Sequence, residues 1–228
     1  NYAVAACPTE AYNNDAVTTL SATTIELLSD TTGGFDIGVE NPNQTQNIVL
    51  DLNGFTLKLG NPAVGSSATV TKGARVLAHS KLLVKNGTLD FTDGEEIMVK
   101  GMNVYGECEL NNVTVEAPAN GFEYTIRNRG ELTLSGTTKV PNAGDAPALV
   151  IEPYDYMYDC DMDAKLNVAS ANVEVGDVLV KLSTIEHYST GKVNSGVPYL
   201  NISAGTFGAL TDDAATATNP KTPEKAIT

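Results

Sequence analysis

The sequence is poor in the residues that nucleic-acid-binding and zinc-binding proteins need. It has 14 Lys and Arg residues against 28 Asp and Glu residues, which gives a formal net charge of -14. Only three residues are Arg, and no basic run occurs, so the chain cannot neutralise a series of phosphates and we expect no nucleic-acid partner. The two His residues lie far apart in the sequence and no CxxC occurs, so no spacing predicts a zinc site.

Cysteine is also scarce. Three cysteines, Cys7, Cys108 and Cys160, do not make a disulfide framework. One pair plus a free thiol and three free thiols both agree with the sequence. Cys108 occupies an apolar position of a repeated motif, so we expect it to be buried as a small hydrophobic residue.

Long hydrophobic runs and lipidation signals are missing, so no membrane span is expected. Hydrophobic residues make up 42% of the chain, whereas aromatic residues make up 6% and Trp is absent. This balance suits a narrow core filled by Val, Leu, Ile and Ala. The chain begins at Asn1 without Met, which fits either a removed leader or a trimmed chain.

What the sequence does contain is a motif that returns six times. Each copy has an apolar residue, a spacer, a second apolar residue, three turn-prone or small residues, then Thr or Asn and a closing apolar residue. The Thr or Asn positions are 56, 88, 114, 138, 172 and 206, and intervals of this length are typical of a stacked repeat array. The copies are Leu50–Leu57, Leu82–Leu89, Cys108–Val115, Leu132–Val140, Leu166–Val173 and Leu200–Phe207.

The alternation within each copy, followed by a break at Asn-Gly, Asn-Asn or Ser-Gly, predicts two strands that meet at a tight bend. A second family of β-rich runs between the copies predicts a third strand per coil, with separators that include Gly101–Asn103 and Arg127–Gly130. Three short strands per turn indicate a parallel β-helix. A β-sandwich is the alternative, but a sandwich has no reason to repeat one motif at this long period. The runs of the second family are Glu96–Val99, Tyr124–Arg127, Ala148–Ile151 and Val178–Leu182.

Four segments resemble the pectin-lyase-like right-handed parallel β-helix, as found in surface proteins of gut bacteria and in phage spike or fibre proteins. They are Thr24–Asp30, Ile48–Leu57, LLVKNGTLDF at 82–91 and TIRNRGELTLSG at 125–136. The resemblance covers residues 23 to 210 and implies an all-β, single-stranded right-handed parallel β-helix, a solenoid of about six to eight coils with loop insertions. It implies little about function, because this fold carries lyases, hydrolases, adhesins and virion proteins alike.

Three regions follow from this pattern. Residues 1–22 have low periodicity, and we expect them to cap or anchor the first coil, since an open end of a β-helix exposes unpaired strand edges. Residues 23–210 form the predicted β-helix. Residues 211–228 are small, polar and proline-bearing, and this composition predicts a flexible linker or an arm that orders against a neighbour.

The main candidate for binding is the insertion Glu152–Asp163, which falls in a long interval between motif copies and is expected to protrude. Tyr154, Tyr156 and Tyr158 alternate with acidic residues such as Asp155, so an extended segment would place the rings on one face. Tyr rings stack on sugars and carboxylates accept hydrogen bonds, so this segment predicts a glycan or protein contact. The alternative is a loop that packs its tyrosines onto the flank.

The same insertion contains Asp159, Asp161 and Asp163, which alternate like the first ligands of a calcium loop. The match then fails, because Ala164 stands where that loop needs Gly and Ser170 stands where it needs a bidentate Glu. If Ca²⁺ binds here, we expect it to rigidify the loop rather than to catalyse, and no other cofactor is expected.

Two arginines form a second candidate. Arg127 and Arg129 alternate and should face the same side, and acidic residues lie about one coil earlier. A basic pair beside an acidic patch can bind a ligand or belong to an active site, whereas ion pairing between adjacent coils is the simpler interpretation. The acidic residues are Asp90, Asp93, Glu95 and Glu96.

These features favour a non-enzymatic protein outside the cell, at a cell surface or on a virion, that holds loops away from its anchor. It would be a surface adhesin module or a phage spike, fibre or decoration protein, with a glycan or a surface protein as its partner. The alternative is a polysaccharide lyase or glycoside hydrolase, for which the sequence shows no catalytic constellation. A third hypothesis is a structural role in which a flank packs in a homo-oligomer such as a trimer, or in a virion or cell-surface lattice.

Overall fold

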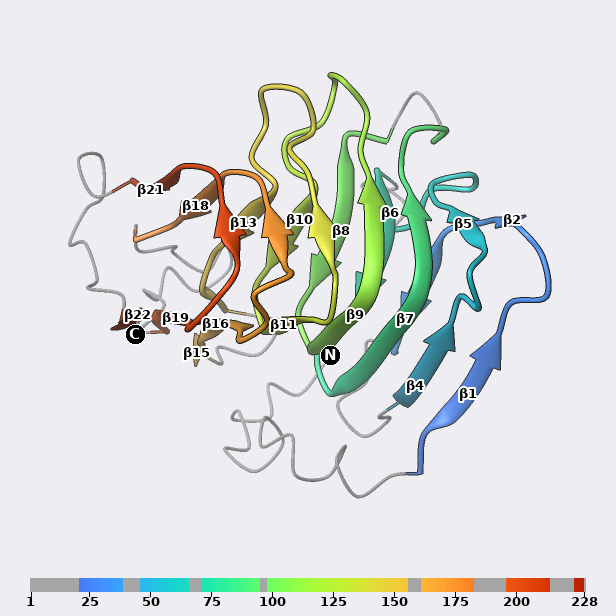
Figure 1. Ribbon diagram of the computed structural model, residues 1–228, viewed down its shortest axis with the longest axis horizontal. Coiled ribbons are helices and arrows are strands. Elements are labelled where there is room, and N and C mark those ends of the chain that lie inside the picture. The colour runs from blue at the N-terminus through green and yellow to red at the C-terminus, as the bar shows by residue number, and fades with distance from the viewer. Residues whose placement is uncertain are drawn as a thin grey trace, which may run out of the picture.

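A computed structural model describes residues 21–38, 46–65, 71–94, 98–155, 161–182, 196–213 and 224–227. Within these ranges all regular elements are β-strands, which stack as successive coils along one axis (Figure 1). No helix in the described ranges is long and apolar enough to cross a membrane.

Most strands belong to two sheets. Sheet A bends along its length. Each of its rungs except the last, β22, is a first strand followed, after the bend, by a short second strand or by the end of the same long strand. Its first strands are, in order across the sheet, β1 (Thr23–Glu26), β4 (Gln46–Asp51), β7 (Ser80–Asp90), β9 (Glu107–Glu116), β11 (Glu131–Ser135), β16 (Ala164–Val168), β19 (Pro198–Ile202) and β22 (Glu224–Ile227). Its short strands are β2 (Thr31–Thr32), β5 (Thr56–Lys58), β12 (Lys139–Val140), β17 (Glu174–Val175) and β20 (Thr206–Phe207). Sheet B contains β3 (Phe35–Ile37), β6 (Lys72–Val76), β8 (Lys100–Val104), β10 (Ile126–Asn128), β13 (Leu149–Ile151), β18 (Val178–Val180) and β21 (Leu210–Asp212).

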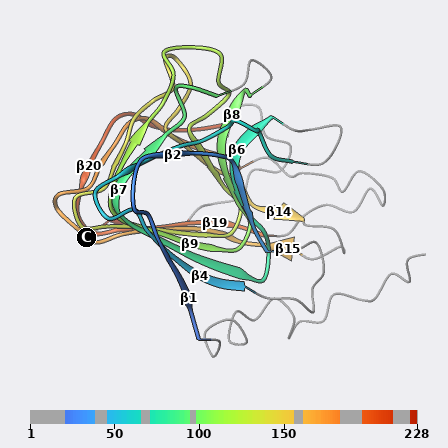
Figure 2. The same ribbon diagram turned by 90° about the vertical axis from the view of Figure 1, so that its right-hand side faces the viewer.

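The connection pattern confirms the predicted parallel β-helix, with about seven coils. The strand pairs within sheets A and B run parallel, and the chain alternates between the two sheets, which excludes the antiparallel β-sandwich. Seen from its amino-terminal end, the chain turns clockwise as it recedes from the viewer (Figure 2). The helix is therefore right-handed, as the resemblance implied.

The later motif copies stack in register at their first apolar residue, whereas the first copy is shifted. Leu82 pairs with Cys108 on one side and with Ile48, not Leu50, on the other. The shift arises because the first copy has a longer bend, in which Asn53 and Gly54 both adopt positive φ angles of 51° and 84°.

The closing half of two later copies is also displaced. Lys139, not Thr138, pairs with Thr114, and Glu174, not Asn172, pairs with Thr206. Thr138 is instead fully buried at the bend, where its Oγ1 donates to the Ser135 carbonyl oxygen at 2.7 Å. Its role is to satisfy buried backbone groups at the bend.

Sheet B agrees with the prediction at its carboxyl end and differs in the middle. Of the strand expected at Glu96–Val99, Glu96 and Ile97 lie outside the described residues, and Met98 and Val99 belong to no strand. The strand of this coil is β8, which spans Lys100–Val104 and includes the segment predicted to separate strands. A Cβ at Gly101 would collide with the Thr125 carbonyl oxygen of the next coil, so this glycine permits close coil packing. Arg127 and Asn128 likewise belong to β10 and not to a separator.

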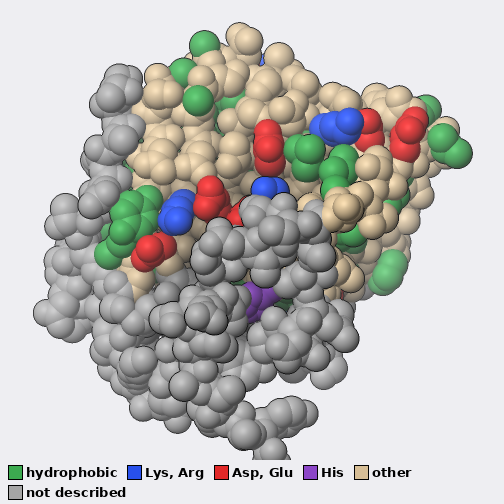
Figure 3. All heavy atoms as spheres, turned by 90° about the horizontal axis from the view of Figure 1, so that it is seen from below, with side chains coloured by type: hydrophobic (Ala, Val, Ile, Leu, Met, Phe, Trp, Pro, Cys, Tyr) green, Lys and Arg blue, Asp and Glu red, His purple; other side chains and the backbone are tan. Residues whose placement is uncertain are grey.

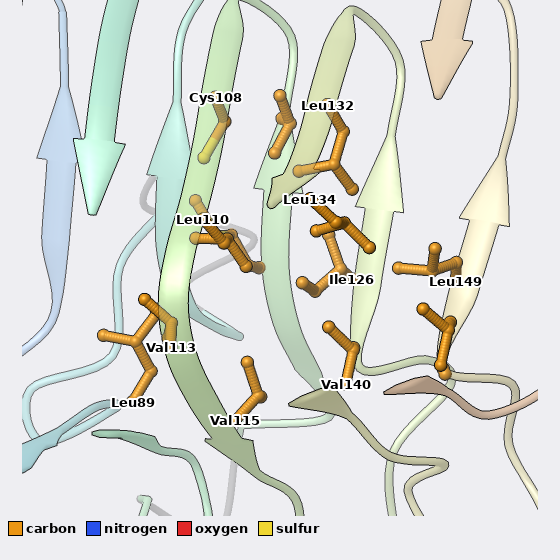
Figure 4. Close-up of a cluster of buried hydrophobic side chains, with 14 of the residues drawn as sticks. Leu89, Cys108, Leu110, Val113, Val115, Ile126, Leu132, Leu134, Val140 and Leu149 are labelled. Atoms are coloured by element: carbon orange, nitrogen blue, oxygen red, sulfur yellow. The ribbon is translucent and has the colours of Figure 1, made fainter. Parts of the chain in front are cut away.

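The core fills the interior between the sheets with stacked aliphatic side chains. Figure 4 shows Leu110 and Leu134 of sheet A near Ile126 and Leu149 of sheet B, all of them fully buried. Cys108 is buried in the same cluster, and burial raises the pKa of its thiol, which confirms its predicted role as a small core residue. Cys7 and Cys160 lie outside the described residues.

The predicted boundaries of the β-helix remain untested. β1 begins at Thr23, close to the predicted start, and residues 1–20 lie outside the described ranges. At the other end β21 reaches Asp212, and Glu224–Ile227 pairs with β19 as β22. The cap at 1–22 and the arm at 211–228 stay predictions.

Candidate functional site

Arg127 and Arg129 lie on the outer face of sheet B. Strand alternation turns Ile126 and Asn128 into the core and leaves Arg127 outside, and Arg129 follows directly after the strand. The two guanidinium groups thus face the same side, as expected from their spacing.

A single carboxylate, Glu152, joins the two arginines. It is next to Arg129 in the adjacent coil, and its Oε2 lies 2.5 Å from Arg129 Nη2 and 3.5 Å from Arg127 Nε. The side chains of Arg129 and Glu152 are each only 12% exposed. The arginines therefore pair with the following coil at a largely buried position.

Tyrosine rings hold both guanidinium groups in place. Arg127 stacks 4.3 Å from the Tyr124 ring centre and Arg129 lies 5.7 Å from the Tyr105 ring centre. The Tyr124 hydroxyl donates to Asn103 Oδ1 at 2.6 Å, and Asn103 Nδ2 donates to the Tyr105 hydroxyl at 3.2 Å. Asn103 thus links the two rings into one rigid unit, and burial raises the pKa of Tyr124.

Other cations complete what we call the arginine cluster. It consists of Lys72, Arg75, Lys100, Arg127 and Arg129. Arg75 Nε donates to Asp36 Oδ1 at 2.7 Å, and Lys100 Nζ lies 3.2 Å from Glu123 Oε1. Burial, followed by the positive charges of the other four members, lowers the pKa of Lys72 from 10.5 to about 8. The cluster therefore brings five cations close together in a chain whose net charge is -14.

This lowered pKa predicts a pH-dependent cost in stability at Lys72, whose residue surface is 8% exposed. Below pH 8 Lys72 is charged in both the folded and the unfolded chain, and the full cost in folding free energy is present. Between pH 8 and 10.5 the unfolded chain binds more protons than the folded one, so this cost disappears as the pH rises. Lys72→Met should raise the free energy of unfolding at pH 7 by roughly 1 kcal/mol. Urea unfolding at pH 7 and pH 10 measures the difference, and a gain of equal size at both values would contradict the assignment.

The predicted tyrosine insertion starts beside the cluster, because only Pro153 separates Glu152 from β14. The backbone of β14 (Tyr154–Asp155) pairs antiparallel with β15 (Asp161–Met162). This hairpin lies outside the wall formed by sheet B (Figure 2). Tyr156 and Tyr158 lie outside the described residues, so the predicted contact through the tyrosine rings stays a prediction.

The predicted calcium ligands are only partly described. Asp159 lies outside the described residues, and Asp161 is described only as backbone of β15. Asp163 Oδ1 accepts a hydrogen bond from the Val197 amide at 2.9 Å, which fixes the start of the next coil. Within the described ranges no group of three or more His, Cys, Asp or Glu residues could hold a metal ion, and calcium stays a prediction for the insertion.

Two of the four acidic residues expected near the arginines are described, and both have other partners. Asp90 accepts hydrogen bonds from the amide and the hydroxyl of Thr92 at 2.7 and 2.6 Å, and Asp93 lies 3.3 Å from Lys58 Nζ. Glu95 and Glu96 lie outside the described residues. The described partners of Arg127 are instead Glu123 and Glu152, one of which lies on the adjacent coil.

The outer flank of sheet A carries a feature that the sequence reasoning missed. Thr133, Asn167 and Asn201 occupy equivalent outward positions on three successive coils. Asn201 Nδ2 donates to Asn167 Oδ1 at 2.8 Å, and Asn167 Nδ2 lies 3.4 Å from Thr133 Oγ1. A groove of about 540 Å³ runs over this row. It is lined by Thr133, Leu134, Ser135, Asn167, Val168, Ala169, Ser170, Asn201 and Ser203.

The groove has a signal in the sequence. Thr133, Asn167 and Asn201 are the spacers between the two apolar residues of the last three motif copies, whereas the second and third copies have Leu83 and Glu109 there. Spacers point away from the core in every copy. The change from apolar or charged spacers in the second and third copies to neutral polar spacers in the last three therefore indicates a change in the outer surface of sheet A. Figure 3 shows this flank from below, where neutral polar side chains and backbone dominate and Lys or Arg stands beside Asp or Glu.

No family model, curated protein or solved structure matches this chain. The parallel β-helix is therefore established by the strand pairing alone, and membership of the pectin-lyase-like family stays a prediction.

The two surfaces offer different chemistry. The arginine cluster is cationic and partly buried, and its described carboxylates serve as counter-ions for fixed guanidinium groups. The groove on sheet A offers amide and hydroxyl groups beside aliphatic carbon, and none of its described lining residues is titratable. The first surface suits anions, and the second suits neutral polar molecules such as sugars.

Proposed function

We propose that this chain is a non-enzymatic extracellular β-helix that binds carbohydrate along the flank of sheet A. It would work in a bacterial surface adhesin or in a phage spike, fibre or decoration protein. The groove over Thr133, Asn167 and Asn201 carries the proposal, because it repeats the same type of hydrogen-bonding group on neighbouring coils. Coils stack roughly 4.8 Å apart, a spacing close to one sugar unit, so a glycan along the axis could use each rung in turn.

The composition of the groove supports binding without turnover. Glycoside hydrolysis needs two carboxylates across the scissile bond, and elimination needs a base. The described lining offers neither, since it consists of Ser, Thr, Asn and aliphatic residues. In the arginine cluster, Glu152 is held by Arg129 as an ion pair, which fixes the position of its carboxylate.

The test replaces the amides of the groove. The double variant Asn167→Ala and Asn201→Ala should weaken glycan binding by about 10-fold, since each lost hydrogen bond contributes roughly 0.5–1.5 kcal/mol. A glycan array and titration calorimetry measure it, beside assays for reducing ends and unsaturated products. Asn120→Ala, at an exposed turn away from the groove, is the control and should bind like the parent chain.

Three outcomes would contradict the proposal. Turnover of any bound glycan would favour the lyase or hydrolase alternative, and binding that survives the double variant would remove the groove from the site. Absence of both binding and turnover would favour the assembly role.

Exposed hydrophobic side chains at the ends of the β-helix support this second candidate, an assembly role in a trimer or a lattice. Among the described residues the exposed large hydrophobic side chains are Ile25 and Leu28 near the first coil and Leu210 on the last strand of sheet B. Apolar groups at the ends of a stack can pack against another copy or a neighbouring module. The oligomeric state in solution, measured by analytical ultracentrifugation, tests this second candidate.

A further inference from the structure

We propose that the arginine cluster is a second binding site, separate from the groove on sheet A, and that it takes the carboxylate of an acidic sugar. The site is the edge of the cluster where Lys100 and Arg127 share the carboxylate of Glu123. Lys100 Nζ lies 3.2 Å from Glu123 Oε1, and Arg127 Nη2 lies 3.8 Å from Glu123 Oε2. Glu123 stands where a ligand carboxylate would bind.

The distribution of charge supports an anionic ligand at this place. All three arginines of a chain with a net charge of -14 belong to the cluster, together with Lys72 and Lys100. Burial, followed by the positive charges of the other four members, lowers the pKa of Lys72, so the five cations lie close enough to interact. Such a local concentration of like charge costs free energy, and a bound anion reduces that cost.

Arg127 is the member of the cluster best prepared for a ligand. The Tyr124 ring fixes its guanidinium plane, so little side-chain entropy remains to be lost on binding. Its contacts with Glu123 and Glu152 at 3.8 and 3.5 Å exceed ordinary hydrogen-bond lengths, so neither carboxylate holds the guanidinium in a close hydrogen bond. A guanidinium of this kind can still form charge-assisted hydrogen bonds.

Glu123 is suited to give way to a ligand. Its side chain is 52% exposed, whereas those of Lys100 and Arg127 are 22% and 21% exposed. The carboxylate can therefore swing into solvent while the two cations stay in place. The small exposed area of these cations suits a single planar carboxylate rather than an extended polyanion, which favours one acidic sugar unit.

The experiment compares sialyllactose with lactose, its neutral parent, by titration calorimetry on the full chain. We expect sialyllactose to bind more tightly than lactose at low ionic strength. Lys100→Gln and Arg127→Gln should each weaken sialyllactose binding by about 10-fold, the value of one charge-assisted hydrogen bond. Glu123→Gln should tighten it by about 5-fold, because it removes the competing charge while preserving size.

The tightening by Glu123→Gln separates a ligand site from a purely structural ion-pair network, which would show no gain. Lys139→Gln, at an exposed pair with Glu174 on sheet A, is the control and should leave binding unchanged. Equal losses in Lys139→Gln and Arg127→Gln, no preference over lactose, or binding of a poly-glutamate peptide in place of sialyllactose would each overturn the proposal.

The two proposals fail separately. The groove variant Asn167→Ala with Asn201→Ala should leave sialyllactose affinity at the cluster unchanged. If neutral glycans bind through the groove while the cluster variants have no effect, only the acidic-sugar site is wrong. If the cluster variants act as expected while no neutral glycan binds, only the function of the groove is wrong.

Discussion

Glu152→Ala is expected to lower the free energy of unfolding by about 3–5 kcal/mol, the usual cost of removing one partner of a buried ion pair. Glu152 Oε2 is the acceptor for Arg129 Nε at 2.7 Å and lies near Arg127 as well. Both arginines would remain in a largely buried setting among further cations. Chemical denaturation at pH 7 measures the loss.

An exposed ion pair of the same type provides the control. Glu174 lies 2.9 Å from Lys139, but these side chains are 59% and 50% exposed. Glu174→Ala should change stability by less than about 1 kcal/mol, because solvent screens such pairs. Equal losses in the free energy of unfolding at Glu152 and Glu174 would show that burial does not determine how much the Glu152 ion pairs stabilise the fold.

The repeated motif predicted the fold because its apolar positions are the ones that stack. Leu132 pairs with Cys108 on one side and Leu166 on the other, as the alignment of motif copies required. A β-helix buries these residues only when neighbouring coils share register, so a pattern visible along the sequence becomes a column in the core.

The bends were harder to predict, because their length depends on backbone conformations that the pattern of apolar residues does not contain. Asn53 and Gly54 extend the first bend, and Thr138 enters the core at a later one. The first shifts the pairing before the bend by two residues, and the second shifts the pairing after the bend by one residue. In sheet B, Gly101 lies within a strand, although glycine usually marks a turn. The next coil approaches so closely here that no side chain fits, and local propensity does not show this tertiary constraint.

The candidate site was predicted in part. Strand alternation was enough to place Arg127 and Arg129 on one face, but their partner Glu152 lies on another coil, and only the register of β10 with β13 brings it beside them. Tyr105 and Asn103 come from the preceding coil for the same reason. The groove was missed because its residues are spacers, whose identity matters only once the coils are stacked.

Gly130→Ala is expected to lower the free energy of unfolding by about 3 kcal/mol, at the upper end of the cost of overpacking. Gly130 forms the corner between β10 and β11. A Cβ at this position would collide with the carbonyl oxygens of Gly106 and Tyr105 in the preceding coil. Since backbone atoms cannot rotate away as a side chain does, the two coils must separate. Thermal and urea unfolding measure the loss.

Gly33→Ala is the matched control, because no atom lies within 4 Å of a Cβ built there and its φ angle needs no glycine. It should change stability by less than about 0.5 kcal/mol. Gly130 also follows Arg129 directly, so a shift at this corner should weaken the contact with Glu152. The cost of Gly130→Ala should therefore be smaller in the Glu152→Ala background, since part of the loss is shared. Strict additivity would show that the corner and the arginine cluster are independent.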